Sequence, residues 1–89
     1  SFLNPELTRE ALKEKIDALF STADYGKIFR VKGFFREGEQ WYQVNASGDA
    51  VHLDPVPAGH GAIIVIGTEL KEEAISILMT GKPPEHRIL

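Results

Sequence analysis

Three side chains of this sequence have the chemistry of metal ligands: His52, Asp54 and His60. His52 and Asp54 are two residues apart, so on a strand both would project from one face. His60 follows a loop rich in proline and glycine and could return over them. Imidazole and carboxylate groups suit zinc, nickel or cobalt. Histidines on surface loops are also common, and the alternative we favour is that none of the three binds metal.

A second group combines cations with aromatic rings. Arg30, Lys32 and Phe34 alternate along one segment, and Trp41 lies on the segment that would return beside it. With a period of two, all four side chains share the outer face of a sheet. Because Trp and Arg dominate the binding energy of many interfaces, these residues predict a docking surface. The alternative is that Trp41 packs under a local loop and that the cations serve solubility.

The tripeptide Lys32-Gly33-Phe34 resembles the start of an RNA-recognition signature. The continuation does not follow that signature, because Phe35 replaces a small residue and Arg36 replaces an aromatic one. The predicted elements also come in a different order from that fold, which interleaves its helices between strands. We therefore predict no nucleic-acid partner.

Signals for catalysis are missing from the sequence. No G-x-x-x-x-G-K-[ST] loop is present for phosphates, and the serines, histidines and Asp54 show no recognisable pairing of nucleophile and base. The chain alone is therefore predicted not to be an enzyme and to hold no cofactor.

Composition sets wider limits. The chain has 89 residues, which suit one domain covering residues 1–89, and it is 43% hydrophobic and 26% charged, as in ordinary globular proteins. Its net charge is −3, so binding to nucleic acid would require a local basic patch on the surface. The absence of cysteine excludes disulfides and thiolate metal sites and agrees with a cytoplasmic protein. No apolar run approaches the roughly 18 residues that span a bilayer, so no membrane partner is predicted.

The two ends of the chain predict helices. Residues 4–21 begin with Asn4-Pro5-Glu6, which combines a capping side chain, a proline at the first helical position and an acid. Residues 68–80 form the second helix, capped by Thr68 and ended by Gly81. The apolar faces of the two helices consist of Leu12, Ile16, Leu19 and Phe20, and of Leu70, Ala74, Ile77 and Leu78. Residues 80–89 are expected to form a loose tail.

Four strands are predicted between the helices. Residues 27–36 alternate, with Phe29 on the face of Val31 and Ile28 on the opposite face. The return strand contains Trp41, and residues 50–54 form a short third strand before a proline loop at 55–61. The last strand, 62–66, is apolar at every position, which predicts burial on both faces. The fold class is α+β, with two layers: a four-stranded, mainly antiparallel sheet with both helices packed on one face.

Several of these segments together resemble the C-terminal domain of CobW-like GTPases, a group linked to cobalamin synthesis and metal delivery. The segments are GKIFRVKGFF, the strand that contains Trp41, the proline loop and AIIVIGTEL. The family pattern is roughly Arg-x-Lys-Gly-Phe, a Trp strand, a proline loop and an apolar-Ile-Gly run before a final helix. This chain departs from it in two places, because His60-Gly61-Ala62 and Thr68 stand where the family often has arginine.

The resemblance implies a fragment of a longer protein with a GTPase unit upstream, and the start at Ser1 without Met agrees with this expectation. GTP, Mg²⁺ and a transition metal are then implied only for the parent protein. The expected role is non-catalytic recognition and regulation, by docking on the GTPase domain or on a client protein that receives metal. The alternatives are a stand-alone interaction module, or a small metal carrier that uses His52, Asp54 and His60.

Overall fold

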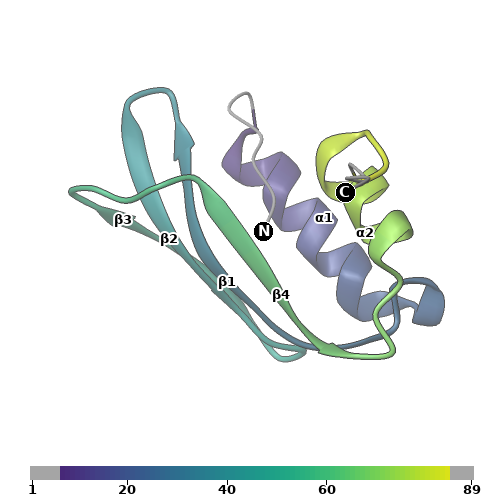
Figure 1. Cartoon of the computed structure of the whole chain (residues 1–89). Helices are drawn as coiled ribbons and strands as arrows, with labels where there is room; N and C mark the ends of the chain where they lie inside the picture. The colour runs from purple at the N-terminus through teal and green to yellow at the C-terminus, as the bar shows by residue number, and fades with distance from the viewer. Residues whose placement is uncertain (1–6, 85–89) are drawn as a thin grey trace.

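The strands and helices form two layers in the computed structural model, which describes residues 7–84 (Figure 1). Within these residues four strands make one antiparallel sheet in the order β3-β2-β1-β4, and two helices cover one of its faces. The predicted α+β class is therefore confirmed. The elements in chain order are α1 Arg9–Ser21, the short 3₁₀ helix η1 Ala23–Tyr25, β1 Lys27–Glu37, β2 Gln40–Ala46, β3 Val51–Val56, β4 Ala62–Thr68 and α2 Glu72–Thr80.

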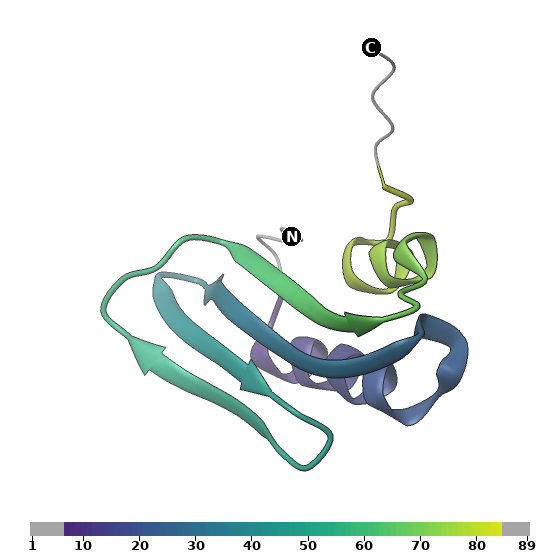
Figure 2. The same cartoon turned by 60° about the horizontal axis from the view of Figure 1, so that its bottom comes forward.

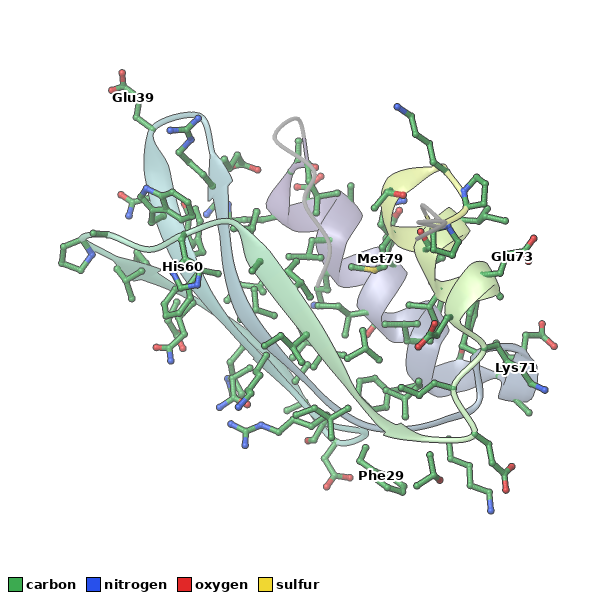
Figure 3. All side chains as sticks on the ribbon, in the orientation of Figure 1. Phe29, Glu39, His60, Lys71, Glu73 and Met79 are labelled. Atoms are coloured by element: carbon green, nitrogen blue, oxygen red, sulfur yellow. The ribbon has the colours of Figure 1, made fainter. Side chains whose placement is uncertain are left out.

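The core lies between the sheet and the helices. From α1, Leu12, Ile16 and Leu19 are at most 1% exposed, as their helical spacing predicts. The sheet contributes alternate residues of its inner face, which are Val31, Phe35, Tyr42, Val44, Ala46 and Ile63. Met79 reaches from α2 toward α1 and is 2% exposed (Figure 3). No helix within residues 7–84 is both long and apolar enough to cross a membrane.

The central hairpin confirms the predicted turn at Glu37-Gly38-Glu39. Glu37 pairs with Gln40, so Gly38 and Glu39 alone connect β1 to β2. Gly38 has φ 61, which fits a two-residue turn with glycine in its first central position. The turn sets the register that places Trp41 opposite Arg36.

Helix α1 begins later than predicted. The proposed start signal, Asn4-Pro5-Glu6, lies outside the described residues, and the helix itself starts at Arg9. Thr8 is its N-cap, because its Oγ1 accepts a hydrogen bond of 3.1 Å from the Ala11 amide. The end at Ser21 agrees with the prediction.

We expect Thr8→Ala to lower the free energy of unfolding by about 1 kcal/mol, since the Ala11 amide loses its acceptor. Urea titration of the variant and the parent chain measures the difference. Thr8→Ser retains the hydroxyl and should restore most of the loss, and an equal loss in both variants would contradict a capping role.

Strand β1 contains an irregularity that the period-two prediction missed. The register with β4 shifts between Ile28 and Arg30, so one extra residue is inserted at this point. As a result Ile28 packs against the core while Phe29 is 56% exposed. The predicted placement of these two residues on their faces is therefore wrong in both cases.

Strand β4 is buried on one face only, contrary to the prediction. Ile63 is 3% exposed, whereas Ile64 and Ile66 are 44% and 36% exposed. Both helices lie on the inner side of the sheet, so within residues 7–84 no helix covers the outer side (Figure 1). A strand that is apolar at every position can be buried on one face or on both, and its sequence alone does not distinguish the two cases.

Helix α2 differs from its prediction at its start and in its buried face. Thr68 ends β4 and caps no helix; α2 begins at Glu72, and Lys71 at its N-cap makes no side-chain cap bond. The residues buried on α2 are Ile75, Ser76 and Met79, while Ile77 is 48% exposed. Gly81 ends the helix in the left-handed conformation, as predicted.

Strand β3 continues through a proline that was predicted to begin the loop. It runs to Val56, and Pro55 pairs with Tyr42. Proline is tolerated here because β3 lies at the edge of the sheet, where an amide hydrogen can be missing without breaking a ladder bond.

Candidate interaction surface on the outer face of the sheet

The outer face of the sheet holds all four residues of the predicted docking surface. Paired residues of antiparallel strands project to the same side. Trp41 is opposite Arg36, and Lys32 and Phe34 are opposite Asn45 and Gln43. On the other side of β1, Arg30 and Lys32 are opposite Ile66 and Ile64. The residues Arg30, Lys32, Phe34 and Trp41 therefore share one face, away from the core.

An exposed apolar group that the sequence did not indicate lies on the same face. We call it the outer stripe, and it consists of Phe29, Ile64 and Ile66, with exposed fractions of 56%, 44% and 36%. Phe29 projects from the sheet on the side away from the helices (Figure 3). Contiguous exposed apolar surface is typical of sites that bind another protein or a ligand.

The two aromatic residues of the predicted surface are each partly covered. The ring of Phe34 lies 6.0 Å from that of His60, and a side chain at Gly59 would meet Phe34 at about 3.0 Å. The Gly59–His60 loop therefore packs on Phe34, which is the arrangement considered as an alternative for Trp41. Trp41 instead lies beneath the guanidinium of Arg36, 5.8 Å from its ring centroid.

The charges on this face are mainly positive. Arg30, Lys32 and Arg36 project from β1, and Asp54 of β3 is the carboxylate on the neighbouring strands of the same face. Arg30 donates a hydrogen bond of 3.2 Å to the amide oxygen of Asn45. Within residues 7–84 none of these three cations is in an ion pair. The face is thus positive although the chain carries a net charge of −3.

The predicted metal ligands do not come together. His52 and Asp54 project from β3 on the outer face, where they pair with Asn45 and Gln43, but His60 lies against Phe34. Phe34 and Asp54 flank Gln43 on opposite sides, so they are two strand spacings apart, roughly 10 Å. In the part of the chain that the structure describes, no group of three His, Asp or Glu side chains is placed to hold a metal ion.

The connection between β4 and α2 does not have the features of a phosphate-binding loop. Among residues 7–84 one strand leads directly into a helix, at the connection from β4 to α2. That connection is Glu69-Leu70-Lys71, without glycine, and the first turn of α2 adds Glu72 and Glu73, so three carboxylates accompany one lysine. Three carboxylates at a helix N-terminus repel an anion, so the residues present do not fit the phosphates of GTP.

The sequence signal for the outer stripe was incomplete. Ile64 and Ile66 were visible as apolar residues, but their exposure depends on both helices packing on the opposite face. Phe29 reaches the surface only because of the register shift in β1. The consecutive apolar residues Ile28 and Phe29 interrupt the alternation at that shift, and this interruption is the sequence signal that could have indicated it.

Comparison with known families gives one result. The family model for the "Cobalamin synthesis protein cobW C-terminal domain" matches residues 3–80. No curated protein and no solved structure matches the chain significantly. The matched segment includes both helices and all four described strands, so the match covers the whole two-layer unit.

Proposed function

This chain belongs to the family of CobW C-terminal domains, and from this membership we propose that it is the recognition domain of a CobW-like GTPase. In general the CobW C-terminal domain is non-catalytic. In our proposal the outer face of the sheet docks on the upstream GTPase domain, and the nucleotide bound there changes the affinity. The same face then becomes available to a client protein that receives metal.

The observation that carries this proposal is the outer stripe beside cations that make no ion pair among the described residues 7–84. Phe29, Ile64 and Ile66 supply apolar surface, and Arg30 and Lys32 border it. A partner that covers the stripe removes apolar area from water, at about 25 cal/mol for each Å². The cations favour a partner surface whose rim is acidic, because complementary charge raises the rate and the specificity of association.

The parent protein, not this chain, would supply GTP, Mg²⁺ and the transition metal. The sequence has no phosphate loop, and the first turn of α2 is acidic. We further propose a cytoplasmic location, which is compatible with a chain that has no cysteine.

Calorimetry with the purified upstream GTPase domain tests the docking proposal. The chain should bind with an affinity that differs between the GTP and GDP states. Trp41→Ala should weaken binding by about 2 kcal/mol, or roughly 30-fold in Kd, as for an aromatic residue that anchors an interface. Arg30→Ala should weaken it less and mainly at low salt, since Arg30 is exposed.

A matched control comes from the opposite side of the molecule. Glu14→Ala changes an exposed residue of α1 and should leave the affinity unchanged. Loss of binding in Glu14→Ala but not in Trp41→Ala would place the contact on the helical layer and refute the proposal. Absence of binding in both nucleotide states would favour a stand-alone interaction module with an external partner.

A further inference from the structure

Strand β4 forms a free edge of the sheet. In the order β3-β2-β1-β4 it pairs with β1 alone. Within residues 7–84 no other element makes extended contact with it. Helix α2 lies beside the C-terminal end of β4, while the N-terminal part of the strand has no helix next to it (Figure 2).

The two edge strands of the sheet differ in whether they contain charged residues and proline. Edge strands of monomeric proteins usually carry proline or charge, which prevents pairing with another chain. Strand β3 follows this rule, since it contains His52, Asp54 and Pro55. Strand β4, Ala62–Thr68, contains neither a charged residue nor a proline, and its Ile64 and Ile66 are exposed. One edge is thus protected against pairing and the other is open to it.

We propose that β4 pairs antiparallel with β4 of a second copy of this chain, which joins two four-stranded sheets into one of eight strands. A two-fold axis at Ile64 sets this residue opposite its own equivalent, and it sets every other residue opposite the one at the same distance on the other side of the axis. A charged residue at the axis would oppose its own charge, whereas β4 brings only apolar or small residues together. This charge-free character favours a second copy over a charged partner segment.

The rest of the fold accommodates this pairing. The two-fold axis sends the two copies of α2 to opposite ends of the joined strands, because each lies beside the C-terminal end of its own β4 (Figure 2). The acidic first turns of the two helices, Glu72 and Glu73, are thereby kept apart. Ile64 and Ile66 of one copy lie beside those of the other and cover part of each other's surface.

The expected dimer is weak. A single pair of seven-residue strands forms an interface below about 1,200 Å², a size found in transient complexes. We expect dissociation constants in the micromolar range or weaker. The pairing uses the strand edge and does not depend on docking by the outer face.

Sedimentation equilibrium of the chain, from low micromolar to millimolar concentration, tests the proposal. The mass should rise from monomer toward dimer. Ile64→Lys should remain monomeric, because the symmetric pair would bring two lysines together. Val56→Lys places the same charge on the outer face of β3, at the protected edge, and should dimerise like the parent chain. A parent chain that stays monomeric throughout, or equal loss in both variants, overturns the proposal.

Two variants of opposite charge at position 64 distinguish a loss of the interface from a loss of folding. Ile64→Glu should also be monomeric alone, and its mixture with Ile64→Lys should form a heterodimer. A mixture that remains monomeric overturns the pairing. The parent chain gives a measurement without any variant, because the β4 amides that do not bond to β1 should exchange more slowly at millimolar concentration. Unchanged exchange in a concentrated sample overturns it as well.

Discussion

Gly33→Ala is expected to destabilise the domain by about 3 kcal/mol or more, because the position accepts no side chain. Gly33 has φ 147, which L residues rarely adopt. A Cβ built there would overlap the backbone oxygen of Ala62 and the Cα of Ile63. Backbone atoms of a paired strand cannot rotate away as a flexible side chain can, so β1 and β4 would have to separate locally. The Lys-Gly-Phe part of the family pattern thus has a structural reason at its glycine.

Chemical denaturation of Gly33→Ala measures this effect against a matched glycine. Gly48 lies in the turn between β2 and β3, and a Cβ there would meet nothing within 4 Å. Gly48→Ala should change the free energy of unfolding by less than about 0.5 kcal/mol. If the two variants lose equal stability, the close approach of β1 and β4 at Gly33 does not exist.

Ile16→Ala is expected to cost about 2–5 kcal/mol, the second large effect. Ile16 is fully buried in the centre of α1, where the helix faces the sheet. Truncation removes apolar area and leaves a cavity whose lining loses contacts. A domain of this size has a total stability of only about 4–13 kcal/mol, so Tm should fall by about 10 °C or more.

Calorimetric scans of Ile16→Ala and Glu14→Ala separate burial from helix propensity. Glu14 is exposed on the same helix, and its replacement by alanine should move Tm very little. A small shift for Ile16→Ala would mean that α1 does not pack on the sheet as described. A large shift for both would point to the helix itself instead of its buried face.

The sequence predicted the elements that depend on local rules. The helical spacing of Leu12, Ile16 and Leu19 identified the buried face of α1, and the glycine at the β1–β2 turn identified the hairpin. The prediction from the sequence was wrong where tertiary packing determines which residues are buried. Leu70 and Leu78 pack against the core as predicted, but Ile77 is exposed, and Ile75 and Met79 are buried in its place. The connection before α2 contains Glu69 with φ 55, a left-handed conformation that the apolar pattern does not indicate.

The candidate surface was predicted in part. Alternation along β1 and β2 was enough to place Arg30, Lys32, Phe34 and Trp41 on one face. The outer stripe was not predicted, because exposure of Ile64 and Ile66 depends on which face the helices cover. Phe29 was assigned to the inner face, because strict alternation was carried through the consecutive apolar residues Ile28 and Phe29, where the register shifts.

The metal hypothesis shows a further limit of sequence spacing. His52 and Asp54 do share a face, as their separation by two residues predicts. The position of His60 depends on the path of the loop before β4, and that loop packs on Phe34 of β1. Strand β2 therefore separates His60 from His52 and Asp54. This separation depends on the order of the strands, which no local sequence pattern indicates.

The most direct test of docking by the outer face is thiol footprinting, because the chain has no cysteine of its own. Asn45→Cys places one thiol at the centre of the outer face, and Glu14→Cys places one on the exposed side of α1. The rate of alkylation is measured for each variant with and without the upstream GTPase domain in its tighter-binding nucleotide state. If the outer face docks, the partner slows alkylation at position 45 and leaves the rate at position 14 unchanged. Protection at position 14 with none at position 45 would contradict docking by the outer face.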